Sequence, residues 1–239
     1  MKIEFFDTLE STSRTAAEAA RSGATHLYTV VAARQTAGRG RLTRSFFSPR
    51  GGLYFSTVLR TELLPCEYGA LTPFAAVAVH RALQRVCGVC AQIKWVNDLL
   101  LDGRKICGIL AESGMDASGQ PYVVLGIGVN TGDAAFPPEL QEIAGNVTCA
   151  DKHALLREIL AELQHAQDAV RRADWLKEYK ENSCILGQRV TLYEGEKIRE
   201  GVALDVFSDG ALLLRLTDGK TERINGGEIS LRVTQNKKN

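Results

Sequence analysis

The chain has 239 residues, of which 45% are hydrophobic and 24% are charged, and its formal net charge is +1. This composition is typical of a globular protein with room for one good-sized domain and a small second one, and no apolar run reaches the ~18 residues of a membrane span. The near-zero charge argues against a protein that lives on nucleic acid, and the acidic N-terminus lacks the apolar core of a secretory signal, so we expect a cytoplasmic protein with no membrane partner.

The first third of the sequence alternates strands with one helix. β-Branched and aromatic residues predict strands over 3–7, 28–33 and 53–59. A hydroxyl group at Ser11, Thr12 or Ser13 can cap an alanine-rich helix that ends near Gly23. The loop over 34–52 is rich in glycine and arginine, and a loop of that length inside a compact domain is usually functional or disordered.

The middle of the chain predicts two helices separated by hairpins. Apolar residues on most faces indicate a buried helix over 71–86, and strand-like runs follow at 92–95, 99–101, 105–112 and 122–129. Asp102-Gly103 and the polar stretch around Ser118-Gly119 suit the turns of antiparallel hairpins. Apolar residues at helical spacing then predict an amphipathic helix over 153–171.

After Leu186-Gly187 the sequence changes to short β runs joined by glycine-containing turns. These runs are 189–193, 201–207, 211–216, 221–224 and 229–233. Small hairpins of this kind predict a compact β-barrel appended to the first domain. We therefore divide the chain into domains at 1–185 and 186–235, and expect the polar residues that follow to be frayed.

Cys87 and Cys90 form a CxxC pair among six scattered cysteines. Such a pair can be redox-active or half of a zinc site, but no second CxxC or histidine pair with ligand spacing accompanies it. Because Val86 and Val89 indicate a buried helix end, we interpret the two cysteines as buried thiols that act as small hydrophobes.

Positive charge is concentrated in one segment. Between Ala19 and Thr61 the sequence has seven arginines and no acidic residue, which favours a small anionic ligand over a long polyanion. Within it, QTAGRGR (35–41) alternates glycines, which let a backbone approach a ligand, with arginines, whose fixed fork of donors suits phosphate or carboxylate. The alternatives are a flexible, solvated basic loop, or a nucleic-acid contact aided by Phe46 and Phe47.

The second candidate segment is KWVND (94–98), followed by GRKICGIL (103–110). Two lysines, an amide and a carboxylate flank a tight hairpin whose other residues are apolar. Asp98 has the chemistry for Mg²⁺, which takes oxygen ligands together with phosphates, and Lys105 lies where a strand enters the core. Taken alone, the segment is equally an exposed β-turn with incidental charges.

A third segment, GIGVN (126–130), is an apolar strand that ends in an amide. Two glycines in a strand mark a bulge or the close approach of a ligand. Asn130 can read the edge of a base, although a turn asparagine also explains the pattern.

Together these motifs resemble one family, the biotin–protein ligases, and specifically the catalytic and C-terminal domains of its bacterial members. The resemblance runs in order from Ser11-Thr12 through GRGR (38–41), KWVND, GRKICGIL and GIGVN to GGEISLR (226–232). It implies an α+β fold in which a mixed β-sheet is flanked by helices, similar to class II aminoacyl-tRNA synthetase domains, and a small SH3-like β-barrel follows.

The resemblance also implies a two-step reaction with ATP, Mg²⁺ and biotin. The carboxylate of biotin attacks the α-phosphate of ATP to give biotinyl-5′-AMP and pyrophosphate, and positive charge must offset the repulsion between the two anions. A lysine of a biotin carboxyl carrier domain then attacks the mixed anhydride and releases AMP. Relatives pair through sheet edges, so a homodimer is a further expectation.

Site residues follow from the resemblance position by position. Those expected to be catalytic are Lys105, Arg41 and Asp98, with Asp98 also serving the metal or the acceptor lysine. Those expected to contact biotin are Ser11, Thr12, Ser13, Gln35, Gly38, Arg39, Gly40, Arg41, Lys105 and Gly108. Those expected to contact the nucleotide are Arg39, Arg41, Phe46, Lys94, Asn97 and Asn130. Phe46 and Phe47 are expected to cover the adenylate, in a loop over 34–52 that is mobile without ligand and ordered with it.

Three features depart from the family pattern. Val96 replaces the usual proline of KWPND, and Leu42 to Phe46 replace the common glycine and tryptophan after GRGR, so Phe46 can cover a site but lacks an indole N–H. Some bacterial relatives begin with a helix-turn-helix and repress transcription. Because this sequence starts directly with the catalytic region, we do not expect repressor activity or DNA binding.

Three rival interpretations remain. A lipoate–protein ligase has a related fold but lacks the GRGR and KWxND pair. A nucleic-acid-binding module would explain the arginine-rich loop and its aromatic residues, and it predicts affinity that falls steeply with salt. A degenerate ligand sensor is disfavoured because Arg39, Arg41, Asp98 and Lys105 are all present.

Overall fold

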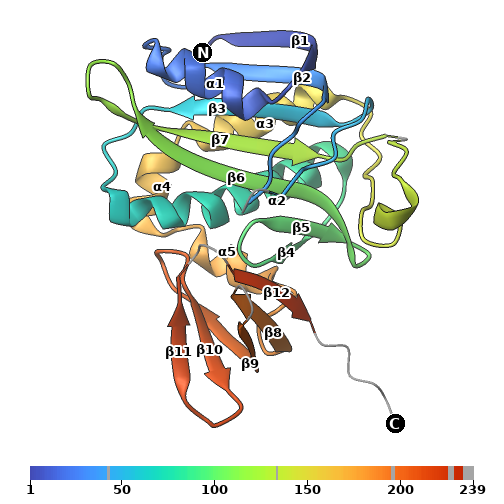
Figure 1. The fold of residues 1–239 in the computed structure, drawn as a ribbon, viewed down its shortest axis with the longest axis vertical. Helices are drawn as coiled ribbons and strands as arrows, with labels where there is room; N and C mark the ends of the chain where they lie inside the picture. Colours follow the sequence, from blue (N-terminus) through green and yellow to red (C-terminus); the bar gives the residue numbers. More distant parts are fainter. Residues whose placement is uncertain (42–43, 133, 195–196, 226–228, 234–239) are drawn as a thin grey trace.

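A computed structural model describes residues 1–41, 44–132, 134–194, 197–225 and 229–233 (Figure 1). Two β-sheets make up its framework, a larger one formed by strands within residues 3–129 and a smaller one formed by the C-terminal part. Leu42 and Thr43, the GGE part of GGEISLR and the C-terminal tail lie outside the described residues.

The larger sheet has seven strands in the order β1-β2-β3-β7-β6-β5-β4. Their bounds are β1 (Ile3–Leu9), β2 (Thr29–Gln35), β3 (Leu53–Leu59), β4 (Gln92–Lys94), β5 (Asp98–Leu101), β6 (Arg104–Met115) and β7 (Pro121–Val129). Only the β1–β2 pair is parallel among the described strands of this sheet, so the sheet is mixed, as predicted. β3 and β7 are buried almost throughout because helices cover both faces.

Helices lie on both faces of this sheet, with more helices on one face than on the other (Figure 1). α1 (Thr12–Arg21) covers one face, where Ala16 and Ala20 allow it to pack closely on β2, β3 and β7. The other face is covered by α2 (Leu71–Cys87), against which α3 (Lys152–Leu163), α4 (Ala166–Arg172) and α5 (Leu176–Glu181) pack. Two short 3₁₀ helices, η1 (Pro65–Ala70) and η2 (Pro138–Leu140), complete this region. Because α1 is short, it leaves the neighbouring part of its face open to the cavity described below.

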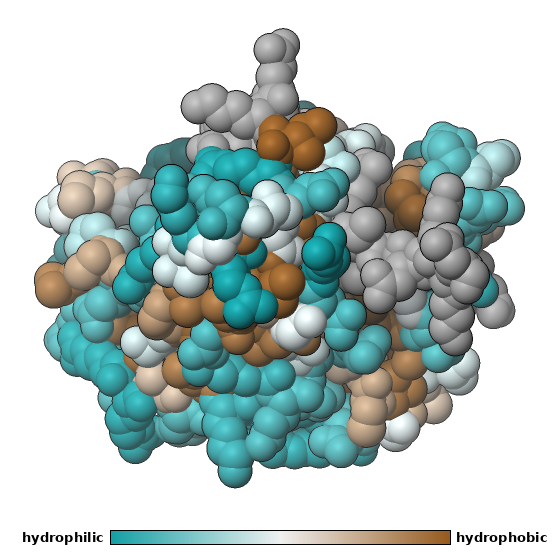
Figure 2. All heavy atoms as spheres, turned by 90° about the horizontal axis from the view of Figure 1, so that it is seen from below, coloured by the Kyte–Doolittle hydropathy of each residue, from teal (hydrophilic) through white to brown (hydrophobic). Residues whose placement is uncertain are grey.

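The smaller sheet has five antiparallel strands in the order β11-β10-β9-β8-β12. They are β8 (Arg189–Glu194), β9 (Lys197–Val206), β10 (Leu212–Leu216), β11 (Thr221–Ile224) and β12 (Ile229–Val233). Its buried residues continue the core of the larger unit, and the buried indole N–H of Trp95 donates to the carbonyl of Gly210 at 2.8 Å. Figure 2 shows the end of the molecule at which this sheet lies; hydrophilic residues cover most of it, with hydrophobic residues showing between them. The predicted fold class is confirmed.

Two predictions from the sequence were wrong in detail. The single helix predicted over 153–171 is two helices, because the backbone leaves helical geometry at His165, which has φ −99° and ψ 13°. Cys90 is exposed rather than buried, because Gly88 ends α2 in a left-handed conformation and turns the chain outward. Cys87 is partly buried, and this burial raises the pKa of its thiol to about 12.

The domain boundary predicted at 185/186 falls between α5, which ends at Glu181, and β8, which begins at Arg189. Within the described residues, no helix is both long and apolar enough to cross a membrane.

Candidate active site

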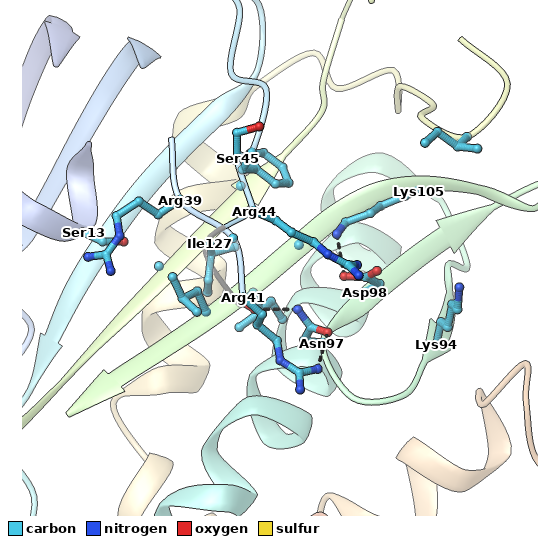
Figure 3. Close-up of a pocket in the computed structure, with 18 of the residues that line it drawn as sticks. Ser13, Arg39, Arg41, Arg44, Ser45, Lys94, Asn97, Asp98, Lys105 and Ile127 are labelled. Atoms are coloured by element: carbon cyan, nitrogen blue, oxygen red, sulfur yellow. Dashed lines mark hydrogen bonds and ion pairs between the residues drawn. The ribbon is translucent and has the colours of Figure 1, made fainter. Parts of the chain in front are cut away.

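A cavity of about 650 Å³ opens on the α1 side of the larger sheet, over the paired strands β6 and β7 (Figure 3). Its walls come from the start of α1, the loop after β2, the turn between β4 and β5, and the segment after β7. Its volume lies within the range of sites that enclose small molecules.

Glycines form the floor of the cavity. Gly108 of β6 pairs with Gly128 of β7, and Gly126 lies two residues before Gly128 on the same face. A Cβ at Gly128 or Gly108 would lie 2.5 or 2.9 Å from the ring of Phe46, so only glycine lets this ring rest on the sheet. The close approach that GIGVN indicated is therefore present, and a planar group can contact the backbone here.

One end of the cavity carries hydroxyl and amide groups. The N-terminus of α1 places Thr12 and Ser13 at the wall, and Gln35 at the end of β2 lies beside them. The amide oxygen of Gln35 accepts from both the backbone N–H of Thr12 at 2.8 Å and its hydroxyl at 3.1 Å. Ser11 is 2% exposed and lies below the wall, where its hydroxyl has no hydrogen-bond partner among the described residues.

Arginines from the loop after β2 occupy the centre. Arg41 is partly buried and donates to the side-chain oxygen of Asn97 at 3.3 Å. Burial lowers the pKa of Arg41, and the negative charge of Asp98 opposes this effect. Arg39, on the Ser13 side in Figure 3, forms an ion pair with Glu112 at 2.9 Å, and Arg44 also lines the wall.

Lys105 and Asp98 form an ion pair with 2.6 Å between Nζ and Oδ1 (Figure 3). The hairpin of β5 and β6, which turns at Asp102-Gly103 with positive φ at both residues, brings the two side chains together. The ammonium of Lys105 also lies 5.7 Å from the centre of the Phe46 ring, a favourable cation–π distance.

Asn97 fixes the turn before β5. Its side-chain nitrogen donates to the carbonyl of Ile109 at 2.9 Å, and its oxygen accepts from Arg41. Lys94 lines the cavity on the same side. The KWVND segment therefore forms a wall of the cavity and is not an exposed β-turn with incidental charges.

Four residues expected at the site do not line the cavity: Ser11, described above, and Gly38, Asn130 and Phe47. Gly38 lies behind it, where a Cβ would be 2.4 Å from the carbonyl of Phe46. Asn130 is buried just beyond the end of β7; its side-chain nitrogen donates to the carbonyl of Lys105 at 3.2 Å, and its oxygen has no partner among the described residues. Phe47, expected as a cover, turns away and packs on Phe136, with 6.3 Å between ring centres.

Several lining residues were not predicted. They include Arg44, Ser45, Trp95, Leu110, Glu142 and Ile143. Glu142 and Ile143 lie in the segment after β7, which no sequence pattern singled out. The segment reaches the cavity because the N–H of Lys105 donates to the carbonyl of Ile143 at 2.8 Å, and that of Gly145 donates to the carbonyl of Lys105 at 2.9 Å. Arg44 was visible only as one of the seven arginines of the basic segment.

The charges define what the cavity can hold. Of the residues that the structure describes, five basic side chains line it (Arg39, Arg41, Arg44, Lys94 and Lys105), against two acidic ones (Asp98 and Glu142). A predominantly cationic centre between a hydrogen-bonding end and a flat glycine floor fits an organic anion together with a phosphate-bearing partner. Mg²⁺ usually takes one or two carboxylates from a protein when phosphates provide further ligands, and Asp98 is the carboxylate beside Lys105 that would fit this role.

A fold and site of this kind define a protein that binds a small organic anion beside a phosphate. The chain belongs to the biotin/lipoate A/B protein ligase family, which residues 5–130 match, and residues 185–232 match the biotin protein ligase C terminal domain. It is 32% identical over 243 residues to the bifunctional ligase/repressor BirA of Bacillus subtilis (strain 168), covering 95% of this chain and 73% of that protein.

A second relative and a solved structure are also similar to the chain. The biotin--[acetyl-CoA-carboxylase] ligase of Paracoccus denitrificans is 32% identical over 204 residues, covering 80% of this chain and 85% of that protein. In fold, the chain is similar to the biotin protein ligase from Aquifex aeolicus in complex with biotin and ATP, with a TM-score of 0.82 and 24% identity over 98% of this chain and 99% of that one.

Proposed function

We propose that the chain is a biotin–protein ligase, which activates biotin with ATP to biotinyl-5′-AMP and transfers the biotin to a lysine of a carrier domain. The observation that carries this proposal is the convergence of Arg39, Arg41 and Lys105 on one cavity whose far end holds Thr12 and Gln35. The hydroxyl and amide oxygens there match the N–H groups of a cyclic urea such as that of biotin. A dithiolane ring, as in lipoate, has no such groups.

The basic residues explain the first step. The carboxylate and the α-phosphate repel each other, and Arg39, Arg41 and Lys105 supply fixed positive charge between the two ends of the cavity. Asn97 holds the guanidinium of Arg41 in place, so this charge needs little rearrangement during the reaction. Asp98 would hold Mg²⁺ with help from the phosphates, and the ion would neutralise charge on the departing pyrophosphate.

Two other features support the nucleotide part of the site. Asn130 does not line the cavity, and we assign it to adenine on its chemistry: its buried side-chain oxygen has no partner among the described residues, and such an acceptor is suited to an amino group. The ring of Phe46 rests on the glycine floor and shields the space next to Lys105 from water.

The second step requires a partner protein. We propose a biotin carboxyl carrier domain as the acceptor, with Asp98 near enough to Lys105 and the cavity to accept a proton from the incoming lysine. We place the reaction in the cytoplasm, in keeping with six cysteines that are all free thiols. Pairing of two copies stays a prediction, which sedimentation at several concentrations would check.

The test is ATP–pyrophosphate exchange with Mg²⁺ and biotin, with lipoate and octanoate as parallel substrates. We expect exchange with biotin alone and a loss of about 100- to 1000-fold in Arg41→Ala or Lys105→Ala, because each removes a positioned donor. Arg50→Ala is the control: Arg50 lies on the same loop but is exposed and paired with Asp7 outside the cavity, so its removal leaves exchange unchanged.

Other results would contradict the proposal. Exchange with lipoate in place of biotin would make the chain a lipoate ligase. No exchange with any acid by a folded sample, together with salt-sensitive binding of RNA or DNA, would make it a nucleic-acid-binding module.

A further inference from the structure

A row of hydrogen bonds connects the loop after β2 to the hydroxyl end of the cavity. At the loop end, the chemistry of the groups fixes which one donates and which one accepts. The hydroxyl of Ser48 donates to the carbonyl of Phe46 at 3.0 Å, because a carbonyl only accepts. Ser48 therefore uses a lone pair to accept from the side-chain N–H of Gln35 at 2.8 Å. This orients the amide of Gln35, with its nitrogen towards Ser48 and its oxygen towards Thr12.

The backbone of Thr12 fixes the same orientation independently. Its N–H only donates, and it lies 2.8 Å from the amide oxygen of Gln35. The hydroxyl of Thr12 donates to that oxygen as well, at 3.1 Å. The single hydroxyl proton of Thr12 is thereby committed to Gln35.

The donor and the acceptor in each of the two remaining hydroxyl pairs are then determined. The hydroxyls of Thr12 and Ser56 lie 2.8 Å apart, and since Thr12 has no further proton to give, Ser56 donates and Thr12 accepts. The hydroxyls of Ser56 and Ser13 lie 3.0 Å apart, and since the proton of Ser56 is used, Ser13 donates. The whole row runs from Ser13 through Ser56, Thr12 and Gln35 to Ser48.

As a consequence, the hydroxyl groups at this end of the cavity act as hydrogen-bond acceptors for a ligand. Thr12 and Ser13 line the wall, and both have already given their protons within the row, so towards the cavity they present lone pairs. Such a wall binds N–H groups and has no hydroxyl proton left for a carbonyl. A cyclic urea, with its two N–H groups, fits these acceptors.

Ser56 is the middle of the row and does not line the cavity. It is fully buried on β3, paired with Gly126 of β7. A Cβ at Gly126 would lie 2.6 Å from the hydroxyl of Ser13 and 3.3 Å from that of Ser56. The two hydroxyls thus occupy the space of the missing side chain, which explains the first glycine of GIGVN.

We infer that Ser56 is a positioning residue for the acid substrate: by accepting the proton of Ser13 it holds that hydroxyl as an acceptor towards the cavity, and by donating to Thr12 it fixes the hydroxyl that Gln35 already holds as an acceptor, so the wall selects a ring that carries N–H groups. This inference rests on the proposed function, in which biotin is the acid. Nothing in the sequence distinguishes Ser56 from an ordinary small residue of a buried strand.

The test compares Ser56→Ala with Thr57→Val by calorimetric titration with biotin. Thr57 is the next residue on β3, equally buried, and its hydroxyl pairs with that of Thr29 on the opposite face of the sheet. We expect Ser56→Ala to weaken biotin binding about tenfold, the effect of one hydrogen bond of about 1.4 kcal/mol. Thr57→Val should bind like the wild type, and the KM for ATP should stay the same in both variants.

A second probe separates positioning from loosening of the strand. Biotin methylated at one ureido nitrogen lacks one N–H, and the ratio of its dissociation constant to that of biotin measures the preference for N–H groups. We expect this ratio to fall in Ser56→Ala, since Ser13 can then turn its proton towards the cavity, whereas the proton of Thr12 stays with Gln35. Ser56→Cys, with a similar volume and a weak S–H donor, should lie between the wild type and Ser56→Ala.

The outcomes are distinct. Unchanged biotin affinity and an unchanged ratio in Ser56→Ala would overturn the inference while the proposed function stands. Equal weakening by Thr57→Val would also overturn it, because the effect would then come from β3 as a whole. A wild-type protein that binds no biotin would remove the proposed function and this inference with it.

Discussion

Phe46 and Phe47 are neighbours in the sequence with opposite positions in the structure. The ring of Phe46 lies against Gly108 and Gly128 on the cavity floor, whereas Phe47 is 43% exposed and packs on Phe136. Only the first can therefore keep water from a mixed anhydride bound beside Lys105.

Removing Phe46 should expose the biotinyl-5′-AMP intermediate to hydrolysis by water. In Phe46→Ala, with biotin and ATP but no carrier, we expect AMP to appear about tenfold faster, because ~1.4 kcal/mol of protection against hydrolysis is lost. Phe47→Ala is the matched control and should release AMP at the wild-type rate. The measurement is AMP formation in single turnover, and equal rates in the two variants would show that the Phe46 ring does not shield the anhydride.

At the level of single residues, the sequence showed which side chains carry reactive groups but not which way each side chain points in the fold. Arg41, Asp98 and Lys105 could be predicted because charged groups in apolar surroundings are conspicuous, and the cavity brings all three together. Phe47 could not be separated from Phe46, since nothing local says which ring faces the sheet. Ser56 was invisible because a small polar residue in a strand has meaning only through the partners that folding supplies.

At the level of elements, strands were predicted better than helix ends. β3 has the predicted bounds of 53–59, because β-branched and aromatic residues buried on both faces have one stable arrangement. The helix predicted over 153–171 was wrong because its apolar spacing continues through Ala166 and Ala169, while the break at His165 carries no glycine or proline signal. Backbone hydrogen bonds with Lys105 bring the segment after β7 to the cavity, and such bonds leave no pattern in the sequence.

The turn between β6 and β7 should make stability depend on pH through Asp116. Its carboxylate accepts from the hydroxyl and N–H of Ser118, from the N–H of Gln120 and from Arg60, and these bonds, with the Ser118 hydroxyl foremost, lower its pKa to about 2. Because the ordinary pKa is near 4, the stabilisation is present above about pH 4 and is lost as the pH falls towards 2.

Urea unfolding at pH 6, 4, 3 and 2 tests this. The difference in unfolding free energy between the wild type and Asp116→Asn should be largest at pH 6 and shrink as the pH falls to 2. Ser118→Ala, which deletes the foremost hydrogen bond, should move the loss to higher pH. Parallel pH profiles for the wild type and Asp116→Asn would contradict the assignment.

At the scale of the whole molecule, the two sheets meet next to the cavity. Trp95 lines the cavity on one side and donates from its indole to the carbonyl of Gly210 on the other. A Cβ at Gly210 would lie 2.8 Å from the carbonyl of Gly69, so the turn before β10 fits tightly against the larger unit. The smaller sheet thereby supports the wall that carries Asn97 and Asp98.

The only other tryptophan of the chain provides a matched control for this contact. Trp175 is fully buried, but its indole N–H has no hydrogen-bond partner among the described residues. Trp→Phe at either position removes a similar volume from the core, yet only Trp95→Phe leaves a buried carbonyl without its donor. We therefore expect Trp95→Phe to lower the unfolding free energy by about 1–3 kcal/mol more than Trp175→Phe does.

The rate of catalysis should also be lower in Trp95→Phe than in Trp175→Phe. Because Trp95 precedes Asn97 and Asp98 by two and three residues, loosening its anchor disturbs the wall of the cavity, so ATP–pyrophosphate exchange should fall in Trp95→Phe and stay at the wild-type rate in Trp175→Phe. Urea unfolding and exchange measured on the same samples check both parts. If both variants lose equal stability and both keep full exchange, the contact with Gly210 neither stabilises the fold nor supports the site.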